Sequence, residues 1–281
     1  LPGTHDLVAY TRSNIAFSPQ TIVMQRNIAM TGDLVRNIDF SSAVTPDSAQ
    51  LTLTGGAWGD TFASVEGITA NGTLVDVSEF PSNQSSFPFI LLPQPAAGDL
   101  YRVSGQVTTD DAWAQVNSWH GTPGDITVPL PEEFTGVSVE YTGAAPVIHG
   151  LNYASAAYGA ARFYVAELTG IDESEDWHSW SCYLTAGALN GATSFALPDP
   201  AGLPGWNDAW SLPELARDWR IYAIGGTMST SELLDLRLNG VSIYEVPCGD
   251  GTAMYSVGSE YRTERSALPR ADSRGFSLFK R

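Results

Sequence analysis

The chain has 281 residues, of which 43% are hydrophobic and 16% are charged, and its formal net charge is −17. A chain of this length can bury a substantial core, in one large domain or in two to three small ones. An acidic surface repels phosphate backbones, which argues against nucleic-acid binding. No apolar run reaches the ~18 residues that a transmembrane helix needs, so none is predicted.

Short apolar stretches bounded by Gly, Pro, Asn and Asp recur along the chain, and amphipathic helical periodicity is nearly absent. This pattern predicts an all-β fold, most simply tandem antiparallel β-sandwiches of immunoglobulin or fibronectin type. Only 212–217 resembles a helical turn. The predicted strands are 5–12, 21–30, 34–40, 50–54, 61–65, 72–77, 86–92, 100–108, 113–119, 126–130, 137–142, 161–168, 177–186, 193–197, 219–224, 233–238 and 241–246.

A sparse internal repeat suggests how the strands are divided into modules. Sliding the sequence by 67 residues places Trp113 on Trp180 and Pro131 on Pro198. Each copy reads as a strand, an acidic turn, a Trp-bearing strand, a Gly-rich turn and a strand ending in Leu-Pro. We therefore expect a β leader over 1–45, sandwiches over 46–135 and 136–251, and a basic tail over 252–281. A single larger sandwich with long insertions is the alternative.

Two stretches resemble known families of bacterial surface modules. The opening residues, Leu1-Pro-Gly-Thr-His-Asp-Leu-Val-Ala9, resemble the closing strand of carboxypeptidase regulatory-like, transthyretin-like modules, although His5 stands where that family usually has an aromatic residue. The later strands with Trp pairs and Leu-Pro ends resemble fibronectin-type-III-like repeats. Both resemblances imply a sandwich fold at a cell surface, and neither implies a catalytic residue.

The C-terminal segment and the rest of the chain carry net charges of opposite sign. Residues 252–281 contain six Lys and Arg against three Asp and Glu, so this segment carries +3 and the rest of the chain −20. Such a tail can dock on its own body or on a neighbouring copy, or it can be a solvated terminus.

Cys182 and Cys248 are the two cysteines, and they predict one disulfide in an exported protein, with two buried thiols as the alternative.

The densest acidic cluster suggests a cation site. Asp172, Glu173, Glu175 and Asp176 lie within five residues, and four such carboxylates repel one another unless they are solvated or neutralised. Calcium takes six to eight hard oxygen ligands, so this loop is a candidate calcium site. It lacks the spacing of an EF-hand loop, and an exposed acidic turn is the simpler interpretation.

A second candidate site consists of aromatic and amide side chains. Trp206, Asn207, Asp208 and Trp210 lie in a loop rich in Gly and Pro. A sugar can pack its C–H face on an indole ring while amides and carboxylates bind its hydroxyls, so a glycan-binding platform is possible here. The alternative is that both Trp side chains plug a core or cover a sheet edge.

No catalytic constellation is visible, and we predict that the protein is not an enzyme. The chain has no zinc-binding spacing, no nucleophile elbow and no phosphate-binding loop. Adjacent Glu132 and Glu133 point to opposite faces of an extended chain, which suits a turn better than a shared site. The leading hypothesis is an extracellular structural or adhesive protein of stacked β-sandwich modules that self-associates, for example into a filament, or binds other surface proteins. A carbohydrate-binding module and a hydrolase with a spatially assembled carboxylate pair are the alternatives.

Overall fold

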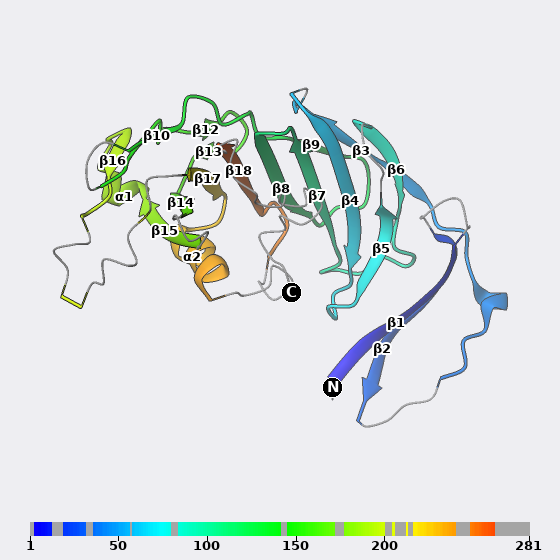
Figure 1. Ribbon diagram of the computed structural model, residues 1–281. Coiled ribbons are helices and arrows are strands. Elements are labelled where there is room, and N and C mark those ends of the chain that lie inside the picture. The colour runs from blue at the N-terminus through cyan, green and yellow to red at the C-terminus, as the bar shows by residue number, and fades with distance from the viewer. Residues whose placement is uncertain are drawn as a thin grey trace. The chain divides into compact units, whose positions relative to one another are not determined.

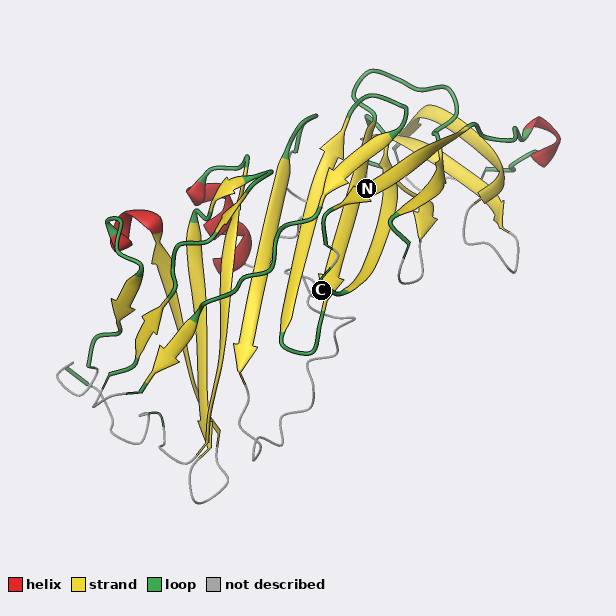
Figure 2. Ribbon diagram, turned by 90° about the horizontal axis from the view of Figure 1, so that it is seen from above, coloured by secondary structure: helices red, strands yellow, loops and turns green. Residues whose placement is uncertain are grey.

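The computed structural model describes residues 3–12, 19–31, 36–56, 58–79, 84–141, 145–171, 177–199, 204–205, 212, 216–239 and 248–261. Within these residues the protein is mostly β, with several antiparallel sheets and few helical segments (Figures 1 and 2). The strands of the first half are β1 (Gly3–Arg12), β2 (Pro19–Met30), β3 (Ser48–Thr54), β4 (Asp60–Ile68), β5 (Leu74–Glu79), β6 (Ser86–Ile90), β7 (Leu100–Thr108), β8 (Ala112–His120) and β9 (Ile126–Pro129).

The described part of the second half contributes the remaining strands and two α-helices. The strands are β10 (Ser138–Glu140), β11 (Val147–His149), β12 (Ala154–Ser155), β13 (Gly159–Ala160), β14 (Phe163–Ile171), β15 (Trp177–Thr185), β16 (Ser194–Ala196), β17 (Ala216–Gly226) and β18 (Ala253–Tyr261). The helices are α1 (Ala186–Leu189) and α2 (Thr230–Leu238), and a 3-10 turn, η1, spans Phe40–Ser42. No described helix has the length and apolar character that crossing a bilayer requires.

An eight-stranded sheet has the order β15-β14-β17-β18-β8-β7-β4-β5. Two three-stranded sheets, β6-β3-β9 and β10-β11-β16, and two hairpins, β1-β2 and β12-β13, complete the described strands. Pairing is antiparallel wherever the register is resolved, except between β3 and β9, which run parallel. Contacts divide the chain into two compact units. The first contains residues 1–107, 116–130 and 248–253, and the second contains 108–115, 131–247 and 254–281.

The two units use the same strand order. In the first, β5-β4-β7-β8 are successive neighbours and β6 pairs with β3. In the second, β15-β14-β17-β18 are successive neighbours and β16 pairs with β11. Six strands of one unit therefore correspond to six of the other, in the same order along the chain. The third strand of each small sheet differs, because β9 follows β8 whereas β10 precedes β11.

Each unit buries its own apolar core. In the first, a side chain placed on Gly105 of β7 would meet Leu53, Val116 and Leu130, so the small sheet and the large sheet are in contact there. In the second, the rings of Phe134, Tyr153, Tyr164 and Tyr255 pack with centroids 5.3–6.2 Å apart. Tyr255 and Phe163 are almost completely buried.

The 67-residue sequence repeat relates two hairpins that occupy different positions in the large sheet. Trp113 and Trp180 both lie on the second strand of a hairpin, β7-β8 and β14-β15, and each hairpin is followed by a strand of a small sheet. However, β8 is an interior strand of the large sheet, whereas β15 is an edge strand. By strand order β14-β15 corresponds instead to β4-β5, so the repeat in sequence is offset from the correspondence in topology.

Several predicted elements are wrong. The predicted strand 233–238 is helix α2, because Ser229 and Glu232 form a capping box and Leu233 and Leu236 bury one helical face. Residues 36–39 are not in a strand, and the predicted helical turn over 212–217 ends inside β17. The segment expected to be a basic tail begins with β18, which pairs with β17 over eight residue pairs. The predicted strand 241–246 lies outside the described residues.

Candidate functional site

Most of the sequence-predicted site residues lie outside the described part of the chain. This holds for the glycan candidates Trp206, Asn207, Asp208 and Trp210 and for the calcium candidates Asp172, Glu173, Glu175 and Asp176. Both sites therefore stay predictions. Among the described residues, no group of three or more His, Cys, Asp or Glu side chains could hold a metal ion.

The predicted disulfide is not formed in the structure. Cys182 lies on β15 and Cys248 lies before β18, and each is a half-buried thiol. Burial raises the pKa of the Cys182 thiol. A disulfide needs Cα atoms within about 7 Å and Cβ atoms that face each other, and the spacing of two cysteines in a sequence does not supply this information.

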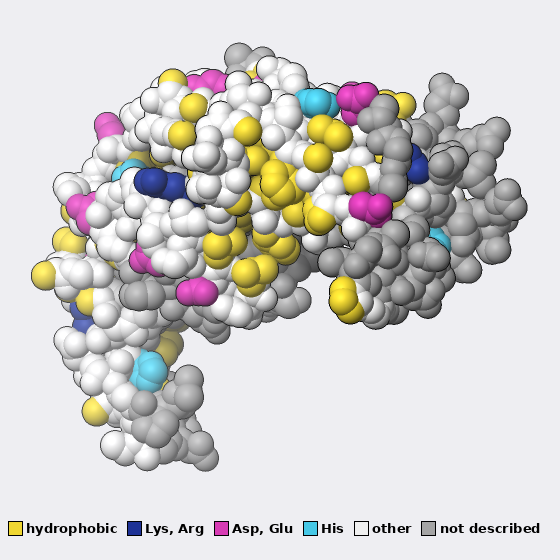
Figure 3. All heavy atoms as spheres, turned by 90° about the vertical axis from the view of Figure 1, so that its left-hand side faces the viewer, with side chains coloured by type: hydrophobic (Ala, Val, Ile, Leu, Met, Phe, Trp, Pro, Cys, Tyr) yellow, Lys and Arg dark blue, Asp and Glu magenta, His cyan; other side chains and the backbone are white. Residues whose placement is uncertain are grey.

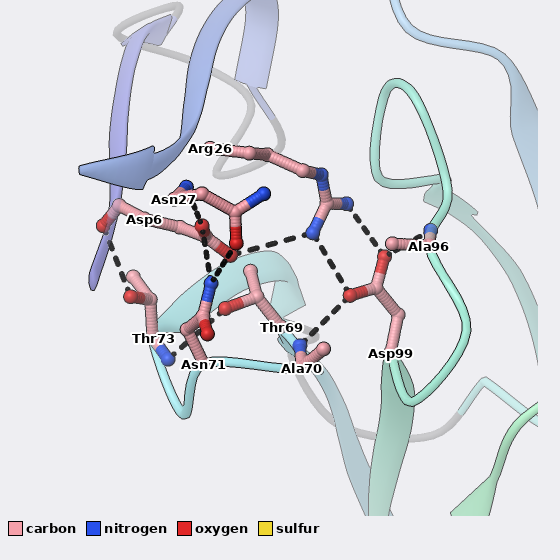
Figure 4. Close-up of polar contacts among 9 residues, drawn as sticks. All are labelled: Asp6, Arg26, Asn27, Thr69, Ala70, Asn71, Thr73, Ala96 and Asp99. Carbon is pink, nitrogen blue, oxygen red and sulfur yellow. Dashed lines mark hydrogen bonds and ion pairs between the residues drawn. The ribbon is translucent and has the colours of Figure 1, made fainter. Parts of the chain in front are cut away.

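The most extensive polar cluster among the described residues ties the β1-β2 hairpin to the rest of the first unit. We call it the hairpin cluster; it consists of Asp6, Arg26, Asn27, Asn71, Thr73 and Asp99 (Figure 4). The Arg26 guanidinium donates two hydrogen bonds to Asp99, at 3.0 and 2.6 Å, and one to Asp6, at 3.3 Å. The side chains of Asp6 and Asp99 are almost fully buried. Such a bidentate ion pair fixes the relative orientation of the two side chains and also pairs their charges.

Backbone N–H groups and a side-chain amide donate further hydrogen bonds to both carboxylates. Asp99 accepts hydrogen bonds from the N–H groups of Ala70 and Ala96, each at 2.9 Å. Asp6 accepts one from the N–H of Asn27, at 2.9 Å, and one from Nδ2 of Asn71, at 2.8 Å. Asn27 adopts a left-handed backbone with φ of 59°, a conformation that asparagine tolerates better than most residues.

The pKa shifts of these carboxyls agree with a structural role. Burial by itself would raise the pKa of Asp99, but hydrogen bonds from Arg26, Ala96 and Ala70 outweigh it, and the pKa lies below its ordinary value. Burial opposes the shift of Asp6 in the same way, and its hydrogen bonds with Asn27, Thr69 and Asn71 lower the pKa. Both carboxylates are thus held ionised, which suits an anchor rather than a proton-transfer group.

Two residues of the hairpin cluster belong to an N-glycosylation sequon. Asn71 is the acceptor of the sequon Asn71-Gly72-Thr73. Its Nδ2, the atom to which a glycan would be attached, donates to Asp6 at 2.8 Å and to Asn27 at 3.2 Å. The Thr73 hydroxyl donates to the Asp6 carbonyl at 3.0 Å. Attaching a sugar would displace these contacts, so this sequon serves the fold.

A second polar group lies on one face of β14, β17 and β18. The Tyr222 hydroxyl donates to Glu167 at 2.8 Å, and Nε of Arg220 donates to Glu260 at 2.8 Å. Tyr222 also packs against Trp113 with ring centroids 5.3 Å apart. Each carboxylate therefore already has a partner, and the group stabilises the sheet. General acid–base catalysis by this carboxylate pair would require one of these hydrogen bonds to break.

A third group has the residue order of a hydrolase triad, carboxylate, histidine and serine, but with the roles of the two ring nitrogens exchanged. Nδ1 of His149 lies 3.0 Å from the Ser194 hydroxyl, and Nε2 lies 3.2 Å from a carboxylate oxygen of Glu140. The three residues come from β11, β16 and β10, and the His149 and Glu140 side chains are 39% and 55% exposed. Water competes for such exposed hydrogen bonds, so cross-strand polar pairing accounts for the arrangement.

Another histidine–serine contact, on β8, is more enclosed. Nε2 of His120 lies 2.9 Å from the hydroxyl of Ser118, two residues earlier on β8. Burial lowers the pKa of His120 despite the nearby Asp250 carboxylate. Asp250 in turn accepts a hydrogen bond from the Gly121 N–H at 2.8 Å. These contacts fix the end of β8.

The strand β15 is the feature that internal contacts leave unexplained. It ends the eight-stranded sheet, so no described strand is hydrogen-bonded to its outer side. Its sequence, Trp-His-Ser-Trp-Ser-Cys-Tyr-Leu-Thr, contains no Lys, Arg, Asp, Glu or Pro. Such residues are how natural edge strands avoid pairing with other chains. The sequence signal was visible, but a sequence does not say which strand lies at an edge.

Comparison of the chain with protein-family models, with curated proteins and with solved structures finds no match. The resemblance to transthyretin-like and fibronectin-like modules therefore stays a prediction.

Proposed function

We propose that the chain is an extracellular structural or adhesive protein, built of two β-sandwich modules, that acts by self-association or by binding other surface proteins rather than by catalysis. The repeated strand order carries the proposal. Two units that place six strands in the same order, each around its own core, are typical of surface proteins made of serial modules. Contact between the large and the small sheet inside the first unit supports a sandwich for that unit.

The polar groups support a non-catalytic role. In the hairpin cluster and in the group around Glu167 and Glu260, the carboxylates are occupied by structural partners. A catalytic acid or base needs a hydrogen-bonding site left for the substrate and a pKa near the working pH. The lowered pKa values of Asp6 and Asp99 move these carboxyls away from that range.

Light scattering and negative-stain microscopy of the whole purified chain test the proposal. We expect particles larger than the 30.1 kDa chain, with a mass that rises with protein concentration. Parallel samples in calcium and in EDTA show whether the predicted cation loop over 172–176 contributes. A chain that stays monomeric in both buffers and binds no surface component would contradict the proposal.

Hydrolysis is the second candidate function, favoured by the hydrogen-bonded order of Glu140, His149 and Ser194. If these residues catalyse, Ser194→Ala lowers the rate of hydrolysis of p-nitrophenyl acetate at least about a hundredfold. Ser138→Ala, on the same sheet, is the matched control and leaves the rate unchanged. Equal rates for the two variants rule out this candidate.

A further inference from the structure

The chain contains three Asn-Gly dipeptides, which are Asn71-Gly72, Asn190-Gly191 and Asn239-Gly240. The structure describes both residues of the first two and only the asparagine of the third. In an Asn-Gly dipeptide the glycine nitrogen can attack the asparagine side-chain carbonyl, because glycine has no Cβ to hinder the approach. The attack needs a glycine N–H that can lose its proton and an asparagine side chain that can rotate. The hydrogen bonds at each dipeptide therefore govern its reactivity.

Asn190 and Gly191 form an exposed corner between helix α1 and strand β16. The Ala192 N–H donates to the Leu189 carbonyl at 2.9 Å, which closes a β-turn with Asn190 and Gly191 at its two central positions. Both central residues have a left-handed backbone, with φ of 48° and 80°. Asn-Gly is the favoured sequence for such a turn. The local sequence thus forms the turn, and the turn exposes the dipeptide.

The two reacting groups at this corner are not held by hydrogen bonds within the described part of the chain. The backbone N–H of Asn190 donates to the carbonyls of Ala186 and Gly187, whereas its side-chain amide and the Gly191 N–H form no hydrogen bond there. Apart from its chain neighbours, no atom lies within 4 Å of the position that a Cβ on Gly191 would occupy. The Asn190 side chain therefore has room to rotate towards the Gly191 nitrogen.

The same dipeptide at Asn71-Gly72 is held in place. The Gly72 N–H donates to the Thr69 carbonyl at 2.7 Å, so Gly72 is the last residue of its turn and its N–H closes that turn. The Asn71 amide nitrogen donates to Asp6 at 2.8 Å and to Asn27 at 3.2 Å within the hairpin cluster. Attack of Gly72 on Asn71 would have to break all three hydrogen bonds.

We propose that Asn190 is a site of spontaneous deamidation and that Asn71 is protected in the folded chain. The Gly191 nitrogen loses its proton to the solvent and attacks Cγ of Asn190. The new C–N bond closes a succinimide ring, and the side-chain nitrogen leaves as ammonia. Water then opens the ring at either carbonyl, which gives an aspartyl or an isoaspartyl residue. Water is the one co-reactant, and nothing is oxidised or reduced.

The reaction changes both charge and backbone at the corner that leads into β16. It adds one negative charge to a chain whose net charge is −17. Figure 3 faces the side of the molecule on which Figure 1 labels α1 and β16, and acidic side chains are already visible at several places on it. The isoaspartyl product also inserts one carbon atom into the backbone. This inference is independent of the proposed self-association, because it concerns the chemistry of a single chain.

Peptide mapping of the whole folded chain tests the proposal. The protein is incubated in mildly alkaline buffer made with heavy-oxygen water, so that only products formed during the incubation carry the label. Mass spectrometry then follows the peptides that contain Asn71 and Asn190. In the folded chain Asn190 should convert at least about tenfold faster than Asn71, because the Asn71 site must open before it reacts. In urea the two sites should convert at similar rates.

Two variants serve as controls. Asn190→Gln should leave its peptide unlabelled, because the longer side chain would have to close a larger ring. Asp6→Ala removes one acceptor of the Asn71 amide and should raise conversion at Asn71 without changing Asn190, which lies in the other unit. Circular dichroism checks that this variant is folded, and the comparison of folded and urea-treated wild type does not depend on it.

The outcomes are distinct. Labelling of Asn190 in the folded chain, with Asn71 labelled only in urea, supports the proposal. Equal conversion of the two sites in the folded chain would overturn it, because the hydrogen bonds would then give no protection. An Asn190 that converts in urea but stays intact in the folded chain would overturn it as well, since the exposed turn would then not permit the attack.

Discussion

The two units place six strands in the same order, yet the edge strands at the two ends of the large sheet have opposite character. β5 has a register shift in its pairing, an acidic side chain and a salt bridge to the β1-β2 hairpin. β15 pairs with β14 without a register shift, carries no charged side chain and is the last strand of the sheet among the described strands. The same connectivity can thus end in an edge with a register shift and a charge or in one without them, and the difference lies in a few side chains and an added hairpin.

Removing Asp99 should have the largest effect on this comparison, because it detaches the hairpin that protects β5. Asp99→Ala leaves Arg26 without its bidentate partner, and breaking a buried ion pair in this way lowers stability by about 3–5 kcal/mol. Urea unfolding measures the change in the free energy of unfolding. Asp47→Ala, an exposed carboxylate of the same unit, should change it by less than about 0.5 kcal/mol. Equal effects of the two substitutions would show that the hairpin cluster does not anchor the hairpin.

The same cluster should make the first unit sensitive to acid. The pKa values of Asp6 and Asp99 lie below the usual 3.8, so the unfolded chain binds protons before the folded one does. Their contribution to stability is complete above that pH and is lost as the pH falls through the folded-state values. Unfolding free energies of the wild type and of Asp99→Asn should therefore converge between pH 5 and the acid limit. A gap that stays constant with pH would contradict this assignment.

On the β15 side, the reactivity of Cys182 measures how far this strand buries its thiol. Burial raises the pKa of its thiol, which lowers the thiolate fraction near neutral pH. In a Cys248→Ser chain, we expect Cys182 to react with a disulfide reagent at least about fivefold more slowly than in urea. A rate equal to that in urea would show that the folded chain does not shield this thiol.

Arg12 should have the smallest effect. Its salt bridge to Asp76 is largely exposed, and the two side chains are 33% and 62% accessible. Such pairs contribute about 0.2–1 kcal/mol and weaken with salt. Arg12→Ala should lower the unfolding free energy by that amount in dilute buffer and by less in concentrated salt. A loss as large as that of Asp99→Ala would mean that the exposed contact, not the buried one, holds the hairpin.

Period-two alternation predicted most strands, because it depends on nearest neighbours in the sequence. The predicted strands 100–108 and 113–119 match β7 and β8 almost residue for residue. The same pattern failed at α2, where a segment with four leucines that follows a capping box was predicted to be a strand. Strand β18 was also missed, because attention to the net charge of residues 252–281 obscured the apolar start of Ala253–Tyr261, whose first six residues are all buried.

The polar clusters were beyond prediction for a different reason. Asp6 and Asp99 are separated by most of the first unit, and Arg26 stands in an ordinary strand pattern. Glu140, His149 and Ser194 likewise come from three strands. No local sequence pattern marks such residues, because their partners depend on which strands become neighbours.

By itself, the sequence determined the secondary-structure class, the positions of most strands and the absence of charge on residues 177–185, since these are local properties of composition and alternation. The tertiary structure decided the strand order, the partners of Arg26 and the location of β15 at an edge. These depend on pairings between residues far apart in the chain, and many different pairings are compatible with the same alternating pattern.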